Sequence, residues 1–448
     1  MSDLHIYVTL GVFATVILAI AFDVVDMALA AMLGVSCLVV FGILNEADIV
    51  SAMRVAGGPL LLLFGGMVVA RVLSTTGVFE RVGNVYLRAT KGSGKRFLLL
   101  LFLLVAPLCA LLPNATTVVL LAPIIIRVAK ALDIDFVPAM VLAAIISNSA
   151  GLLTLVGDPA TFLVGSSIGM SFGEYLRKVS LGGVAAVLVP LALVPVLMPD
   201  LWRMRRPLPP AEAAPPIKHP WFAAASLAVL AAMVVLFVVG EELPTRIVPP
   251  AVAVIGASLA LLVAFTAKLE PLDNILGDID WKTLVFLAGI FCLVEAFAKT
   301  GLLQIMALQL HAWFGSQLMQ VAMMMILGIG LLSSLLANVP VVAGSLVMIK
   351  GYLVAAAVVP EMALAPEFTA WPAQTLPVFI AMMFGATLGG NATLIGASAN
   401  VVAAGACAAN GRRLTFARFL RYGLPIMACQ LAVSAGYVYL LGRFAFKA

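Results

Sequence analysis

Apolar runs long enough to cross a lipid bilayer recur along the whole chain. A membrane-spanning helix needs about 20 mostly apolar residues, because each residue advances the helix by about 1.5 Å. Runs of this kind occur at Ile6–Phe22, Met27–Leu44, Gly57–Leu73, Val137–Ile168, Val179–Met198, Trp221–Val239, Val248–Phe265, Thr283–Phe297, Leu376–Cys407 and Gly423–Leu441. Charged residues make up 10% of the chain, against about a quarter in soluble domains. The sequence therefore predicts an all-α integral membrane protein.

Two more apolar regions are each interrupted midway by a polar break. Residues 97–130 contain the break Pro113–Thr117, and residues 318–350 contain the break Ala337–Pro340. The arms are short for a full crossing, and unwound backbone persists at membrane depth only where protein or water satisfies its hydrogen bonds. We therefore expect two re-entrant hairpins, each entering and leaving the membrane on one side.

The two halves of the chain repeat one another. Gly65 and the hairpin residue Asn114 recur 224 positions later as Gly289 and Asn338. Residues 154–161 recur 239 positions later as residues 393–400, so a longer connection must follow the second hairpin. Such self-similarity indicates that one structural unit is used twice.

Each predicted repeat holds five transmembrane helices, one of them broken, and one re-entrant hairpin. The first repeat is expected at 1–206, with its hairpin at 97–130 and its broken helix at 137–168. The second is expected at 219–448, with its hairpin at 318–350 and its broken helix at 376–407. A Pro-rich linker at 207–218 joins the two.

Positive charges give the predicted orientation. Basic residues in the segment 199–220 place the linker in the cytoplasm, because lysine and arginine gather in cytoplasmic loops. The first hairpin then opens to the cytoplasm and the second to the exterior, so the repeats are inverted. Inverted repeats with broken helices are typical of alternating-access carriers, whose site lies at the midplane where the breaks meet.

Composition argues against several other classes of protein. The net charge of +5 comes without a basic stripe interleaved with aromatic residues, so nucleic-acid binding is not expected. The five cysteines lie in apolar runs without paired spacing, and the three histidines lie near helix ends. We expect no metal site, no cofactor and, since no nucleophile with a base is visible, no enzyme. A passive channel is the alternative from another class, and hairpins opening to opposite faces argue against it.

Polar residues at the four breaks are the candidate binding groups. Asparagine and threonine there bind a solute or cap the next helix, and glycine permits unwinding. The predicted substrate-binding residues are Asn114, Thr116, Thr117, Asn148, Thr154, Asn338, Asn391, Thr393, Ser398 and Asn400. The predicted unwound positions are Gly151, Gly157, Gly390 and Gly396.

Three charges inside apolar runs need an explanation, because charge is costly within a membrane. Asp158 lies in the first broken helix, where it carries a coupling proton or caps the following helix. Arg71 and Glu295 are 224 positions apart and so are repeat equivalents. They form an ion pair near the pseudo-symmetry axis or take part in transport.

The second broken helix carries the most specific motif. Gly389-Gly390-Asn391-Ala392-Thr393-Leu394-Ile395-Gly396-Ala397-Ser398-Ala399-Asn400-Val401-Val402 resembles the second-repeat signature of the arsenite-permease and P-protein branch of the ion transporter superfamily. Asn148–Thr154 with Gly157-Asp158-Pro159 resembles the first-repeat counterpart. The resemblance covers essentially the whole chain and implies secondary transport of small ions or oxyanions.

The sequence also departs from that family pattern. Many relatives carry an acidic residue beside the hairpin asparagine, whereas Pro113 and Ala337 stand there in this chain. The departure weakens the case for a sodium-coordinating carboxylate pair and favours proton coupling or a neutral substrate.

We therefore predict a multi-pass transporter of the cell inner membrane that exports arsenite or antimonite in exchange for protons. The alternatives are a sodium- or proton-coupled carboxylate or anion transporter and a sodium/proton antiporter of the same superfamily. The predicted partners are the inorganic solute, protons and the lipid bilayer, and the resemblance adds a homodimer and a soluble ATPase.

Overall fold

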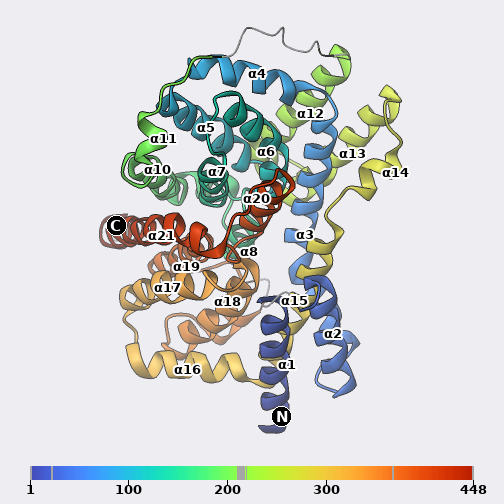
Figure 1. Cartoon of the computed structure of the whole chain (residues 1–448). Coiled ribbons are helices and arrows are strands. Elements are labelled where there is room, and N and C mark those ends of the chain that lie inside the picture. The colour runs from blue at the N-terminus through green and yellow to red at the C-terminus, as the bar shows by residue number, and fades with distance from the viewer. Residues whose placement is uncertain (1–2, 22–23, 209–216, 218, 366–367, 446–448) are drawn as a thin grey trace.

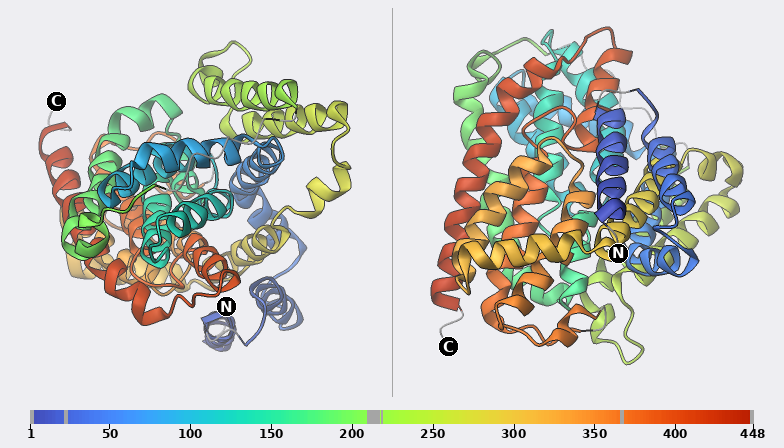
Figure 2. Two further views of the ribbon diagram at one scale, coloured as in Figure 1. Left: turned by 45° about the horizontal axis from the view of Figure 1, so that its top comes forward. Right: turned by 90° about the horizontal axis from the view of Figure 1, so that it is seen from below.

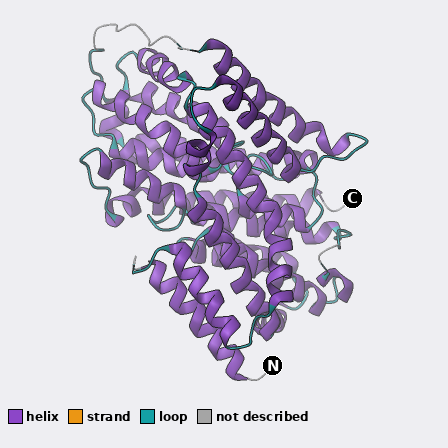
Figure 3. Ribbon diagram, turned by 90° about the vertical axis from the view of Figure 1, so that its right-hand side faces the viewer, coloured by secondary structure: helices purple, strands orange, loops and turns teal. Residues whose placement is uncertain are grey.

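The computed structural model describes residues 3–21, 24–208, 217, 219–365 and 368–445. Within these residues the regular elements are helices, joined by loops and one isolated β-bridge between Ser93 and Arg205 (Figures 1 and 3). Eight helices of the described segments are long and apolar enough to cross a membrane. The predicted all-α membrane fold is confirmed.

The first half contains four helices before its hairpin, and after it a broken helix and one further apolar helix long enough to cross a membrane. These elements are α1 (Asp3–Ala21), α2 (Met27–Val40), α3 (Glu46–Ser74), α4 (Val78–Thr90), α5 (Gly94–Cys109), α6 (Asn114–Ala131), α7 (Val137–Ala150), α8 (Pro159–Ser167), α9 (Phe172–Lys178), α10 (Ser180–Leu197) and α11 (Pro199–Arg203). The predicted linker falls largely outside the described residues, which omit 209–216 and 218.

The second half repeats this order. Its elements are α12 (Pro220–Val239), α13 (Pro249–Ala267), α14 (Leu272–Gly277), α15 (Trp281–Thr300), α16 (Leu302–Phe314), α17 (Leu318–Ser333), α18 (Asn338–Ala355), α19 (Leu376–Gly389), α20 (Ser398–Ala409) and α21 (Phe416–Leu440). The hairpin α5–α6 recurs 224 positions later as α17–α18, and α7 and α8 begin 239 positions before α19 and α20.

Two ion pairs show that the repeats are inverted. Arg71, in the last turn of α3, bonds to Asp278, which precedes α15. At the other end, Asp48 in the first turn of α3 bonds to Lys299 in the last turn of α15. Because α3 and α15 are repeat equivalents and run antiparallel, the second repeat is turned over relative to the first.

Matched glycines allow matched helix contacts. A Cβ atom at Gly65 of α3 would lie 2.4 Å from the carbonyl oxygen of Ala253 in α13. A Cβ atom at its equivalent, Gly289 of α15, would lie 2.9 Å from the Cβ of Ala31 in α2. Both distances are shorter than van der Waals contact, so the absent side chain lets each pair of helices pack closely.

Both predicted broken helices are present, but the hairpin breaks are displaced. Residues 110–113 and 334–337 are unwound, and Asn114 and Asn338 are already the first residues of the following helices. The predicted breaks at Pro113–Thr117 and Ala337–Pro340 were therefore placed too late. The extended backbone of Pro113 and Ala337 ends each turn, so the polar residues after it are helical.

Two helices were not anticipated from the sequence. α4 and α16 join α3 and α15 to the hairpins, and in the right-hand view of Figure 2 α16 lies across the direction followed by α1 and α21. α4 carries charged residues among its apolar ones, so its sequence contains no apolar run long enough to indicate a membrane-spanning helix. Such helices lie along a membrane surface rather than through it.

Candidate functional site

Four helices begin at one cavity in the protein interior. The cavity has a volume of about 550 Å³ and is lined by Asn114, Pro159, Asn338 and Ser398, the first residues of α6, α8, α18 and α20. None of these four starts has a side-chain capping hydrogen bond, whereas α2, α3 and α15 are capped. Uncapped N–H groups make a helix start partly positive, so the cavity favours an anionic or oxygen-rich ligand.

The two broken helices meet through polar side chains. The Asn148 amide donates to the side-chain oxygen of Asn400 at 3.0 Å, and the hydroxyls of Thr161 and Thr387 lie 3.4 Å apart. Asn148 and Thr387 are 239 positions apart, as are Thr161 and Asn400, so the two contacts are symmetry equivalents. All four side chains are buried. The axis of the inverted repeats therefore passes between two buried polar contacts.

Asp158 is the charge that lies deepest in the cavity. Its side chain is 4% exposed and its Oδ2 accepts a hydrogen bond from the Thr387 hydroxyl at 2.8 Å. The other charged residues lining this cavity are Asp26 and Asp280, near its mouth. The repeat equivalent of Asp158 is Ala397, so the second half contributes no matching carboxylate.

Two buried oxygen atoms near Asp158 have no hydrogen-bond partner. They are the side-chain oxygens of Asn114 and Asn148, and both residues line the cavity. Buried polar atoms are nearly always paired, so an unpaired acceptor at a cavity marks the place of a missing donor. A hydroxyl group of a solute or a bound cation would satisfy these atoms.

Two threonines tie the broken helices to the hairpin turns. The Thr154 hydroxyl donates to the carbonyl of Ala110, and its equivalent Thr393 donates to the carbonyl of Ser334. Neither residue lines the cavity. Their role in the structure is to hold the unwound backbone, not to face a ligand.

Glycine allows the unwound segments to approach each other. A Cβ atom at Gly151 would lie 2.9 Å from the Cβ of Asp158, and one at Gly157 would lie 2.9 Å from the carbonyl oxygen of Gly151. In the same way, an added Cβ atom at Gly390 would meet the Asn338 side chain, and one at Gly396 would meet the carbonyl oxygen of Gly390.

The remaining predicted binding residues lie around the cavity rather than on it. Thr116 lines a neighbouring cavity with Arg71, and Thr117 is buried within α6. The Asn391 amide donates to Ser149 at 2.9 Å and to Gln430 at 2.8 Å. Asn400 bonds to the backbone of the second break as well as to Asn148.

The expected ion pair between Arg71 and Glu295 is wrong. Arg71 bonds to Glu270 at 2.7 Å and to Asp278, near the start of α15, whereas Glu295 lies about four turns into α15. Inversion explains the error, because equivalent residues near helix ends are carried to opposite faces of the membrane.

Sequence reasoning missed the polar partners contributed across the axis. Thr161 and Thr387 look unremarkable in apolar segments, and Ser149 and Gln430 satisfy Asn391 from elements far apart in sequence. The repeat offset was a usable signal for both threonines, because it makes Thr387 the equivalent of Asn148 and Thr161 the equivalent of Asn400.

The cavity opens toward the end of the molecule that carries the linker. Its mouth is lined by Asp26, paired with Lys282 at 2.9 Å, and by Asp280. Asp278 lies two residues before Asp280 and bonds to Arg71 at the end of α3. The chain continues from α3 into α4, which ends shortly before Gly94. The backbone N–H of Gly94 donates to the carbonyl of Met204, at the start of the linker segment.

Inverted repeats, paired hairpins and two broken helices around a polar cavity define a multi-pass membrane transporter. The chain belongs to the citrate transporter family (CitMHS), whose profile matches residues 17–371.

Several proteins are similar over the full length of this chain. An "uncharacterized transporter" of Synechocystis sp. is 42% identical over 98% of both chains. The "46 kDa membrane protein" of Mycobacterium leprae is 31% identical over 97% of this chain and 98% of its own. The human P protein is 26% identical over 97% of this chain and 60% of its own length.

Among solved structures, the Alcanivorax borkumensis YdaH transporter aligns with a TM-score of 0.49 at 12% identity, covering 89% of this chain and 88% of its own.

Proposed function

We propose that this chain is a secondary carrier that works by alternating access and moves a small carboxylate together with a proton. Membership of the citrate transporter family supports a carboxylate as the substrate. The observation that carries the proposal is the cavity in which four uncapped helix starts surround one deeply buried carboxylate, Asp158.

The helix starts supply the attraction for an anion. No lysine or arginine is among the residues that line the described cavity, so backbone N–H groups and the amides of Asn114 and Asn338 would bind the substrate carboxylate. Each helix start carries roughly half a positive charge. Weak, distributed donors of this kind also allow release, which a carrier requires.

Asp158 would couple the movement of substrate to the movement of a proton. An ionised Asp158 and an anionic substrate repel each other at close range, and a buried charge is costly without a partner. Protonation removes the repulsion, so substrate and proton bind together and cross together. Thr387 holds the ionised carboxylate by its hydroxyl when the cavity is empty.

Arsenite or antimonite export in exchange for protons is the second candidate. The absence of lysine and arginine from the described lining favours a neutral hydroxide such as arsenous acid as much as an anion. The unpaired oxygens of Asn114 and Asn148 would accept its hydroxyl protons.

The proposal also includes the orientation of the protein in the membrane. With the segment 199–220 in the cytoplasm of a bacterial-type inner membrane, the mouth near Asp26 and Asp280 faces inward. The structure then corresponds to the inward-open state of the transport cycle.

The test is uptake into proteoliposomes under an imposed proton gradient, with citrate, malate, arsenite or antimonite, each with and without sodium. We expect gradient-driven uptake of a carboxylate that does not need sodium. Asp158→Asn should abolish gradient-driven accumulation but retain exchange of labelled for unlabelled substrate. The exposed control Asp273→Asn should behave as wild type.

Movement of arsenite or antimonite without carboxylate would select the second candidate. Sodium-dependent uptake, or accumulation by Asp158→Asn that still follows the proton gradient fully, would refute proton coupling through Asp158.

A further inference from the structure

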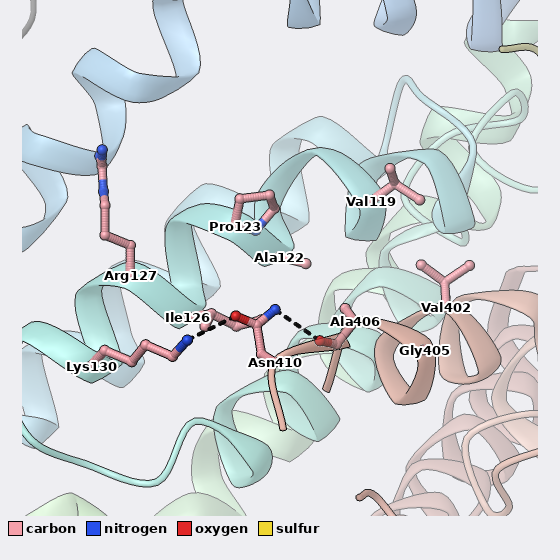
Figure 4. A pocket seen from close by; sticks show the side chains of 10 residues that line it. All are labelled: Val119, Ala122, Pro123, Ile126, Arg127, Lys130, Val402, Gly405, Ala406 and Asn410. Carbon is pink, nitrogen blue, oxygen red and sulfur yellow. Dashed lines mark hydrogen bonds between the residues drawn. The ribbon is translucent and has the colours of Figure 1, made fainter. Parts of the chain in front are cut away.

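A second cavity lies between α6 and α20 and shares no lining residue with the interior one (Figure 4). Its volume is about 640 Å³. Along α6 its wall is apolar at Val119, Pro123 and Ile126, and along α20 it is apolar at Val402 and Ala406. We call this cavity the α6–α20 groove.

One end of the groove carries two positive charges. Lys130 donates to the side-chain oxygen of Asn410 at 2.8 Å and lies 5.8 Å from the ring centroid of Phe136. Arg127 donates to the backbone carbonyl of Glu80 at 2.9 Å. In the described part of the chain neither forms an ion pair with a carboxylate. An ammonium has three donors and a guanidinium five, so several remain for another acceptor.

The position of these charges matches the geometry of a lipid. α6 begins at the interior cavity and ends near Lys130, so the basic end of the groove lies at a membrane face while its apolar walls lie at the depth of the acyl chains. Figure 4 shows Lys130 and Arg127 at this same end of α6, with Pro123 and Gly405 deeper along the groove.

We propose that the α6–α20 groove binds one anionic phospholipid. Its phosphate contacts Lys130, which points into the groove, while Arg127 bonds to α4 and adds positive charge at the same end, and an acyl chain lies over Pro123 and Gly405. Charge complementarity selects this occupant, because a zwitterionic lipid fills the apolar part equally well but gains less at the basic end. Gly405 leaves the groove open, since an added Cβ atom there meets no other atom within 4 Å.

The site would bridge the two halves of the carrier. α6 belongs to the first repeat and α20 to the second, and both begin at the interior cavity, at Asn114 and Ser398. A lipid held between them contacts both arms of the transport site from outside.

The test is native mass spectrometry of the full-length protein in detergent with equal amounts of phosphatidylglycerol and phosphatidylcholine of the same acyl chains. We expect one retained phosphatidylglycerol. Lys130→Gln and Arg127→Gln should each lower its retention about fivefold, the effect of one basic residue near an anionic headgroup. Gly405→Phe should abolish retention by filling the groove.

Two matched controls separate the groove from general effects. Gly436→Phe adds the same ring at another helix glycine whose Cβ would meet nothing within 4 Å, and Lys268→Gln removes an exposed charge elsewhere. Both should retain the lipid.

Equal retention of the two lipids, or retention by Gly405→Phe as in wild type, would overturn the proposal. Lys130→Gln keeps the result interpretable if the phenylalanine variant fails to fold. A dimer that Gly405→Phe converts to monomer would assign the groove to a second copy of the chain instead.

Discussion

The two halves of the interior site share a backbone but differ in chemistry. Asn114 and Thr154 of the first half recur as Asn338 and Thr393 of the second, and both threonines hold a hairpin carbonyl. The carboxylate of Asp158, in contrast, is replaced by Ala397. The shared threonines keep an unwound segment in place, which both halves need.

The difference indicates that the two halves have different roles in transport. The unpaired side-chain oxygens of Asn114 and Asn148 both belong to the half that holds Asp158. Asn338, at the equivalent start in the second half, is already paired within the protein: its side-chain amide lies 2.8 Å from the Ser333 hydroxyl and within 3.2 Å of the carbonyls of Ala386 and Gly396, to which its nitrogen donates. We infer that the coupling proton uses the first half alone and that the second half contributes binding groups to the substrate.

Moving the carboxylate from one half to the other gives the largest expected effect. Asp158→Ala should reduce proton-driven uptake to the level of liposomes without protein, because no other carboxylate among the described residues lies at that depth. Adding Ala397→Asp should not restore it. The new carboxylate would face Asn148, which is the equivalent of Thr387. The Asn148 amide already donates a hydrogen bond to Asn400.

The control is Ala397→Asp alone, which should retain proton-driven uptake at a reduced rate. Recovery of uptake in the double variant would show that the halves are interchangeable and would contradict the proposed division.

The two hairpin asparagines should separate stability from transport. Asn338→Ala removes a buried hydrogen bond and should lower the free energy of unfolding by about 1 kcal/mol. Asn114→Ala removes an oxygen without a partner, so it should weaken substrate binding while the melting temperature stays unchanged. Thermal unfolding in detergent and the KM for uptake measure the two effects. Equal loss of stability in both variants would contradict this assignment.

The sequence was sufficient for most of the architecture because the repeat and the apolar runs are encoded locally. Polar breaks within apolar regions predicted the hairpins and the broken helices, and the offsets of 224 and 239 positions showed that each occurs twice. The start of the second arm of each hairpin was less accessible, because asparagine is strongly preferred at the N-cap, whereas Asn114 and Asn338 are the first helical residues here.

The contacts across the axis could not be derived from the sequence. Which residue faces Asp158 depends on how α8 and α19 lie against each other, and Thr387 follows an apolar run without any local signal. The pairing of Arg71 with Glu270 and Asp278 was missed for the same reason, because inversion decides which helix ends meet.

The hydrogen bonds from Thr154 and Thr393 to the hairpin turns give the smallest expected effect. Comparing them tests most closely whether the two halves share one scaffold. Thr154→Val and Thr393→Val each remove one hydroxyl that donates to a hairpin carbonyl while keeping the side-chain volume. A hydrogen bond within a membrane protein contributes about 0.6 kcal/mol on average, so each variant should lower the melting temperature slightly. Thr393→Val should lower it a little more than Thr154→Val, because the Thr393 hydroxyl also accepts a hydrogen bond from the backbone N–H of Gly396 at 3.1 Å. Thr266→Val is the matched control, because its exposed hydroxyl bonds only within its own helix. If one tie proves several times stronger than the other, the two halves differ in their backbone as well as in their chemistry, and the scaffold is not shared.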